Sequence, residues 1–157
     1  MTTTISNKVL VQNWTDQEAS LSKIKSAYTE TEVLFSPVPS SNQELEEILS
    51  YIRKNLFCNS LRVSSVEALF HLNTNKKLKL MLKNALQGRS LQSFIVYHRI
   101  TLGKRLLLET DVLVSLIAYN LGYESAEAFI VRFNKYYGMY PAHFRKNKAS
   151  MLRCLSG

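Results

Sequence analysis

The chain has 157 residues, with 20 Lys and Arg against 12 Asp and Glu, so its formal net charge is +8. Hydrophobic residues make up 46%, which allows a buried core in one domain or two very small ones. Two cysteines exclude a disulfide scaffold and the usual four-cysteine zinc sites. No apolar run approaches the roughly 18 residues of a membrane span, and the first residues lack a secretory signal. We therefore expect a cytoplasmic protein with no membrane partner.

Basic residues are unevenly distributed along the chain. Residues 1–41 carry a net charge of −1 and the remainder carries +9. The segment 68–108 contains eight Lys and Arg and no acid, and six more Lys and Arg follow Glu127, again without an acid. Such blocks can be the solvated face of a domain with any function. Two of them in one small chain favour a polyanionic partner.

Helical periodicity dominates the chain, and its five Gly and three Pro favour helices over an all-β fold. Residues 1–35 are ambiguous, with the spacing of a short helix over 17–28. Residues 36–41 are rich in Pro and Ser and are interpreted as a linker. The apolar spacing then predicts helices over 42–55, 63–70, 76–86, 91–109, 112–121, 125–137 and from Pro141 onward. The expected fold is all-α, with about seven helices and no sheet.

Several helix boundaries are predicted from capping residues. Ser41 or Asn42 can cap the helix over 42–55, and Ser125 can cap a helix that ends at Gly138. Thr110 and Asp111 are expected to end one helix and to cap the next, which would begin at residue 112. Gly88 and Gly122 are expected at the ends of two further helices.

A short helix, a tight turn and a second helix occur twice, over 63–86 and over 112–137. This order is typical of the helix-turn-helix unit, which needs a small residue inside its first helix and favours Gly at its turn. Ala118 and Gly122 supply both features in the second unit. The helix that follows has aromatic residues at helical spacing, which we expect in the core rather than stacked on bases: Phe129, Phe133, Tyr136 and Tyr137. Its opposite face could enter a major groove.

The stretch over 99–145, RITLGKRLLLETDVLVSLIAYNLGYESAEAFIVRFNKYYGMYPAHFR, closely resembles the DNA-binding domain of AraC/XylS-type bacterial transcription regulators. The most specific part is 117–145, with its I-A-x-x-L-G-[FY] and F-x-x-x-[FY]-G-x-x-P-x-x-[FY]-R elements. Residues 99–110 resemble the linker helix that joins the family's two helix-turn-helix units. The resemblance covers roughly 42–147, more weakly in its first half. It implies a compact all-α domain that regulates transcription, places two recognition helices in successive major-groove segments, and needs neither catalysis nor a cofactor.

The resemblance also implies a domain division. Residues 1–41 would be a short N-terminal segment and linker, and residues 42–157 the DNA-binding domain. Within that domain, the first helix-turn-helix is expected at about 42–88, the linker helix at about 91–109 and the second helix-turn-helix at about 111–147. Residues 1–41 are too short for an effector-binding domain of ordinary size. No small-molecule effector domain is therefore expected.

The chain departs from the family pattern at several positions. Gly103 stands where the family usually has Ala, and a Gly inside a helix costs about 1 kcal/mol relative to Ala. Leu116 stands where Glu is common. In the first unit, Leu72 replaces a common turn Gly, and Thr74 occupies the usual cap position. The first unit is therefore the more eroded of the two.

Matching positions give the candidate DNA-binding residues. In the second unit, Glu127 can accept from cytosine N4, and Ile130 and Val131 can contact a thymine methyl group. In the first unit, four lysines with no acid nearby suit phosphate contacts better than base reading. The full expected set is Lys76, Lys77, Lys79, Leu80, Lys83, Ser125, Ala126, Glu127, Ile130, Val131, Asn134 and Lys135. Alternatively, the lysines form a solvated face, and Ile130 and Val131 are buried or face a protein partner.

The leading hypothesis is a sequence-specific, double-stranded DNA-binding transcription regulator of AraC/XylS type. The alternative is a degenerate helix-turn-helix protein that acts as a protein-protein interaction module or anti-regulator, with RNA polymerase or another regulator as its partner. The eroded first unit, Leu80 and the apolar Ile130 and Val131 favour this alternative, whereas the basic blocks oppose it. No enzyme or metal site is expected, because the three histidines are scattered. Cys58 and Cys154 are expected to be small apolar packing residues.

Overall fold

The computed structural model describes residues 3–36 and 42–155, with side chains described over 15–36 and 42–148. These residues form eight helices and no strand, which confirms the all-α prediction with one helix more than expected. The helices are α1 (Thr3–Thr31), α2 (Gln43–Asn55), α3 (Val63–Leu69), α4 (Lys76–Ala85), α5 (Leu91–Glu109), α6 (Val114–Asn120), α7 (Ala126–Tyr137) and α8 (Pro141–Leu155).

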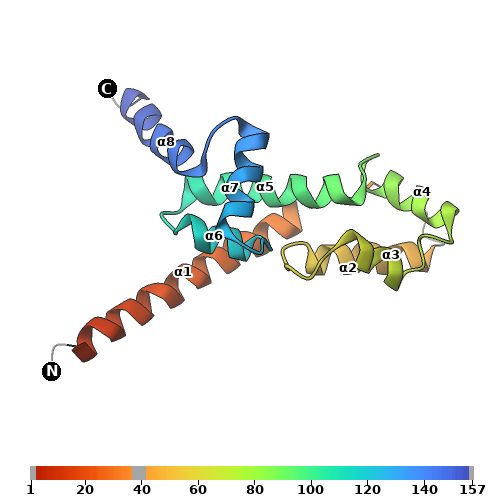
Figure 1. The fold of residues 1–157 in the computed structure, drawn as a ribbon, viewed down its shortest axis with the longest axis horizontal. Coiled ribbons are helices and arrows are strands. Elements are labelled where there is room, and N and C mark those ends of the chain that lie inside the picture. The colour runs from red at the N-terminus through yellow and green to blue at the C-terminus, as the bar shows by residue number, and fades with distance from the viewer. Residues whose placement is uncertain (1–2, 37–41, 156–157) are drawn as a thin grey trace.

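The long helix α5 is the axis of the molecule. Helices α2, α3 and α4 lie toward its N-terminal end, and α6, α7 and α8 lie toward its C-terminal end (Figure 1). Helix α6 packs on α7, and α5 contacts α6, α7 and α8. In the first group, α4 packs on α2. The chain thus carries two helical units joined by one continuous helix.

Local capping explains most of the helix boundaries. The Oδ1 atom of Asn42 accepts a hydrogen bond from the Leu45 amide at 3.0 Å, so Asn42 is the cap of α2. Ser125 caps α7 through a 3.1 Å bond from the Ala128 amide to its Oγ. Gly138 ends α7 with a φ of 69°, a left-handed conformation that Gly adopts without strain.

Two predicted caps are wrong. Asn75 rather than Thr74 caps α4, because the Asn75 Oδ1 accepts from the Leu78 amide at 3.0 Å, while the Thr74 hydroxyl donates to the His71 carbonyl. Asp111 caps no helix, since α6 begins at Val114 with no side-chain cap. The physical reason is tertiary: Val112 is buried and its carbonyl accepts a 2.7 Å bond from Arg145, which holds this stretch outside the helix.

The N-terminal helix differs most from its prediction. Helix α1 has 29 residues, whereas the sequence predicted a short helix over 17–28. Leu21 and Tyr28 are buried, and α1 packs against α5. The predicted linker over 36–41 lies outside the described residues except for Ser36, whose amide donates to the Ala85 carbonyl. Residues 21–36 therefore belong to the same core as the other described helices.

Aromatic contacts attach α1 and its continuation to α5. The Tyr28 hydroxyl and the His98 Nδ1 atom form a buried hydrogen bond of 3.0 Å. Phe35 stacks on Phe94, with ring centroids 5.6 Å apart. Burial raises the pKa of Tyr28 and lowers that of His98 to about 4, so both groups are neutral near pH 7. These contacts join α1 and the residues that follow it to α5 through side chains that carry no charge near pH 7.

The close approach of α5 and α7 explains Gly103. A Cβ atom at residue 103 would lie 2.8 Å from Cε2 of Phe129 and 3.0 Å from Cδ1 of Leu121. Phe129 and Phe133 are fully buried, as predicted. The prediction was wrong for Tyr136, whose side chain is 48% exposed and which lies outside the core. Gly103 therefore makes room for the second unit in spite of its cost to helix propensity.

Candidate nucleic-acid interface

Helix α7 presents a mixed outward face. Burial of Phe129 and Phe133 on one side leaves Glu127, Val131 and Lys135 exposed on the other. The Val131 side chain is 66% exposed, and the carboxylate of Glu127 lies in the first turn, where the helix dipole favours an acid. This face contains a charged acceptor and an apolar group, both of which can read base edges in a major groove.

Other residues predicted for the α7 interface are less accessible. Ala126, Ile130 and Asn134 are half-buried, and Ile130 packs against the core. Exposed Ser125 uses its Oγ to cap the helix. The structure thus brings Glu127 and Val131 together on the accessible surface, while much of Ile130 is committed to packing.

Helix α4 presents the predicted lysine face. Leu78, Leu82 and Ala85 are buried. The exposed residues are Lys76, Lys77, Lys79, Leu80 and Lys83. The Leu80 side chain is 60% exposed. It borders a groove of about 520 Å³ between α3, α4 and the start of α5. The floor leucines of this groove are almost fully buried, so Leu80 is its main accessible apolar group.

The expectation that no acid pairs with the α4 lysines is wrong for one of them. Glu67, which immediately precedes the acid-free block in sequence, lies on α3, and its Oε1 accepts from the Lys79 Nζ at 2.6 Å. Lys79 is half-exposed in this pair. No ion pair involving Lys76, Lys77 or Lys83 occurs among the described residues. The free positive charge of the α4 face is therefore concentrated on those three side chains.

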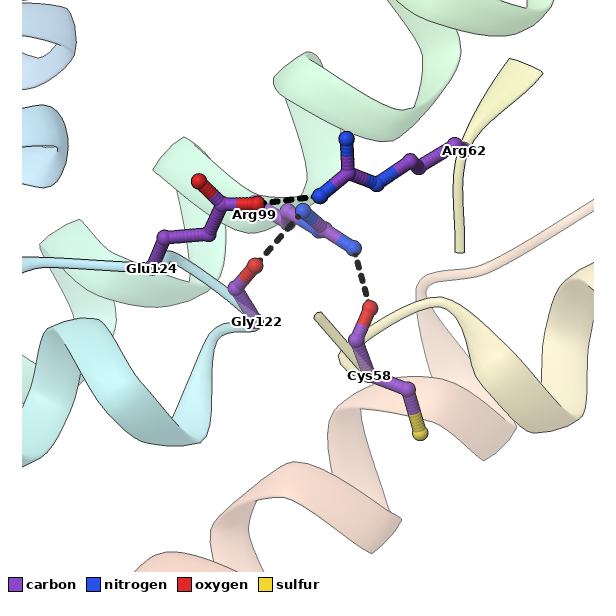
Figure 2. Close-up of polar contacts among 5 residues, drawn as sticks. All are labelled: Cys58, Arg62, Arg99, Gly122 and Glu124. Carbon is purple, nitrogen blue, oxygen red and sulfur yellow. Dashed lines mark hydrogen bonds and ion pairs between the residues drawn. The ribbon is translucent and has the colours of Figure 1, made fainter. Parts of the chain in front are cut away.

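An arginine-lined cleft lies between the two units and was not predicted. It has a volume of about 450 Å³, and its lining includes Arg62, Arg99 and Arg132. Arg62 forms an ion pair with Glu124 across the cleft (Figure 2). Arg132 is an exposed residue of α7, so the helical pattern of α7 could have predicted that its side chain is accessible. Arg62 and Arg99 meet the second unit only through the tertiary fold, so the sequence contains no signal for them.

Arg99 connects the two units from the middle of the fold. Its Nε donates to the Leu56 carbonyl at 2.9 Å, its Nη2 to the Cys58 carbonyl at 2.7 Å, and its Nη1 to the Gly122 carbonyl at 3.0 Å. Figure 2 shows the guanidinium between Cys58 and Gly122. A Cβ atom at residue 122 would lie 2.9 Å from the Arg99 Nη2, and its φ of +83° also favours Gly. Burial lowers the pKa of Arg99 from its usual value.

The remaining candidate groups for chemistry do not form a reactive cluster in the described part of the chain. His71 and His143 are exposed, and His98 is buried against Tyr28. The described residues contain no group of three or more potential metal ligands, and none of their helices is long and apolar enough to cross a membrane. Cys58 is exposed, so its predicted packing role is wrong, and Cys154 lies outside the described side chains.

Comparison with known proteins gives matches for part of the chain. A family model described as a helix-turn-helix domain matches residues 74–147. The HTH-type transcriptional regulator YtdP of Bacillus subtilis (strain 168), described as uncharacterized, is 28% identical over 109 residues. That match covers 69% of this chain and 14% of YtdP. The chain therefore spans only a small part of the length of this curated relative.

Two solved structures resemble the fold. The C-terminal domain of the two-component response regulator yesN from Fusobacterium nucleatum subsp. nucleatum ATCC 25586 is 27% identical, with a TM-score of 0.56, over 66% of this chain and 99% of that one. The DNA-binding domain of AdpA, solved with a target DNA, is 20% identical, with a TM-score of 0.57, over 70% of this chain and 96% of that one. These relatives are described as a response-regulator domain and as the DNA-binding domain of a transcriptional factor. Residues 74–147 match the helix-turn-helix family model, and the chain is similar in sequence and fold to the DNA-binding domains of AraC-type transcription regulators.

Proposed function

We propose that the chain binds double-stranded DNA in a sequence-specific manner and regulates transcription, acting in the cytoplasm on the nucleoid. The observation that carries this proposal is the pair of outward helix faces, on α4 and on α7, held by one linker helix in an AraC-type domain. The relative solved with a target DNA supports the same use of this fold. RNA polymerase or another regulator would be the second partner through which a bound regulator acts.

The two faces have different chemistry and would divide the work of recognition. The free lysines of α4 are flexible point charges, which suit phosphate contacts that hold the protein on the duplex. The α7 face contains Glu127 and Val131, which can distinguish bases in the major groove. A pure protein-interaction module would not need three unpaired lysines on one short helix. The DNA-binding function is therefore the better supported of the two hypotheses.

The first test is direct binding to DNA. Selection from a random duplex pool should yield a preferred site. Affinity for that site should fall linearly in a log–log plot against salt, with a slope of about −0.9 per phosphate neutralised. A titration at several salt concentrations measures this slope, and a scrambled duplex provides the non-specific reference. If the full chain has no detectable affinity for any duplex even at low salt, the proposed function is wrong.

Glu127 is expected to read one base. Glu127→Ala should change the preferred base at one position of the selected site and alter discrimination there by roughly 1–3 kcal/mol. Glu44→Ala is a matched control, because Glu44 is also an exposed first-turn acid but lies on α2. Site selection with both variants measures the effect. If Glu127→Ala returns the wild-type preferences, Glu127 acts only as a favourable charge at the helix N-terminus.

The α4 lysines are expected to anchor rather than to read. Replacing Lys76 and Lys83 together by Ala should weaken all sequences about equally and flatten the salt slope by roughly one unit for each phosphate that is no longer neutralised. Lys79 is left unchanged, because its replacement would also release Glu67. A control that removes two other exposed lysines, Lys23 and Lys54, should leave the slope unchanged. A double variant that changes base preference without altering the salt slope would show that these lysines themselves read bases.

A further inference from the structure

The two helix-turn-helix units are attached to each other through a small polar bridge. Arg99 lies on α5, yet its three carbonyl acceptors belong to segments that precede and follow that helix in sequence. The Leu56 and Cys58 carbonyls follow α2 in the first unit, and the Gly122 carbonyl lies in the turn between α6 and α7 in the second. One guanidinium therefore bonds the backbone of both units.

A second contact repeats this connection at the surface. Arg62 immediately precedes α3, and Glu124 lies just before Ser125, the cap of α7. Their ion pair joins the start of the first unit's helix pair to the start of the second unit's outward helix (Figure 2). Both side chains are largely exposed, so the pair adds little to stability. Its position nevertheless restrains the same relative movement as Arg99.

The chemistry of the bridge favours a fixed geometry. A guanidinium is planar and presents its donors in a rigid fork, whereas a lysine ammonium is a compact charge on a flexible stem. Three carbonyl acceptors at 2.7–3.0 Å leave the Arg99 fork little freedom. Because Gly122 has no Cβ atom, the second unit's turn can lie directly against the guanidinium. The two outward helices are thereby held at one separation.

We propose that Arg99 is a positioning residue that sets the spacing of two DNA half-sites, one read by α7 and one contacted by α4, where the exposed Leu80 can contact a thymine methyl group. This inference depends on the proposed function. Two linked modules bind together only when the geometry allows both to engage, and avidity is lost when it does not. One added base pair moves a half-site by about 3.4 Å and rotates it by about 36° around the duplex. A rigid bridge converts such a shift into a loss of affinity, whereas a loosened bridge tolerates it.

The experiment measures affinity for the selected site and for sites with one base pair inserted or deleted between the half-sites. Wild type should lose affinity by roughly 100-fold when the spacing changes. Arg99→Lys keeps the charge but not the fork, so its loss should shrink to roughly tenfold while its affinity for an isolated half-site is retained. Glu124→Gln removes only the exposed ion pair with Arg62 and leaves the core intact. Its loss of affinity on a change of spacing should lie between those of wild type and Arg99→Lys.

Arg145→Lys is the matched control. Arg145 also donates to two backbone carbonyls, of Leu107 and Val112, but both lie at the C-terminal end of α5 and before α6. This variant should keep the wild-type spacing profile. If Arg99→Lys keeps the wild-type profile, or if Arg145→Lys flattens it as much as Arg99→Lys, the inference is wrong.

A measurement without DNA separates failure of this inference from failure of the proposed function. Paramagnetic labels at Lys77→Cys and Lys135→Cys, in a Cys58→Ser and Cys154→Ser background, report the distance between α4 and α7. Arg99→Lys should broaden the distribution of this distance relative to the same labelled protein with Arg99 intact. If the unlabelled wild type binds no DNA, the proposed function fails, and the labels still decide whether Arg99 fixes the geometry. An unchanged distribution would overturn the inference even if DNA binding is normal.

Discussion

Replacing Tyr28 by Ala is expected to lower the free energy of unfolding by about 3–5 kcal/mol, the range for deletion of a large buried aromatic side chain. Tyr28 is 2% exposed, its ring packs edge-on against Phe57 and His98, and its hydroxyl bonds the His98 ring. The variant removes these contacts and leaves the buried His98 Nδ1 atom without its partner, which adds a desolvation cost. Chemical denaturation followed by far-UV circular dichroism measures the change.

Tyr28→Phe separates the two parts of this effect. The ring contacts remain and only the hydrogen bond to His98 is removed, so the expected cost is about 1 kcal/mol. Lys25→Ala, on the same helix, should cost well under that amount, because Lys25 forms no ion pair with any described residue. If Tyr28→Ala also costs less than about 1 kcal/mol, α1 does not pack on α5 in solution, and the DNA-binding domain folds independently of its N-terminal helix.

The elements that were predicted well are those defined by neighbours in sequence. Helix α7 begins and ends at the predicted residues because Ser125 bonds an amide three residues ahead and Gly138 adopts a left-handed conformation. Both signals are local and need no tertiary contact. The buried positions of α2 and α4 likewise follow from the 3.6-residue period.

The elements that were missed depend on partners distant in sequence. Helix α1 has a weak apolar pattern, and its Tyr28 packs against His98, which lies 70 residues further along the chain on α5. The start of α6 is moved by the bond from Arg145 to the Val112 carbonyl, although Asp111 has the chemistry of a cap. Local propensity is overridden in both places by tertiary contacts.

The candidate interface shows the same division. The exposed lysines of α4 and the exposed Val131 follow from which positions face the core, so the helical period predicted them. The Lys79–Glu67 pair and the bridge at Arg99 join residues on different helices. Periodicity orients each helix but does not place one helix against another. Polar contacts between different helices could therefore be identified only from the structure.

His98 is expected to make the stability of the protein depend on pH in a defined window. Its pKa is lowered to about 4, first by burial and then by the charge of Arg89, whereas an unfolded histidine titrates near 6.5. Between these values the unfolded chain binds more protons than the folded chain, so the free energy of unfolding rises with pH. Above about pH 6.5, His98 is neutral in both states and its full contribution to the free energy of unfolding is present. As the pH falls to about 4, the free energy of unfolding decreases by about 3 kcal/mol in all.

Carboxylates also titrate near the acid end of this window, so the effect of His98 must be measured as a difference between variants. His98→Phe keeps an aromatic ring beside Phe94 and Tyr97 but cannot take up a proton, and its free energy of unfolding should depend less on pH between 6.5 and 4. His143→Phe removes an exposed histidine and should keep the wild-type dependence. Denaturation at a series of pH values measures all three proteins. Equal pH dependence for wild type and His98→Phe would mean that the imidazole remains accessible to protons, and hence that α1 opens readily from the linker helix.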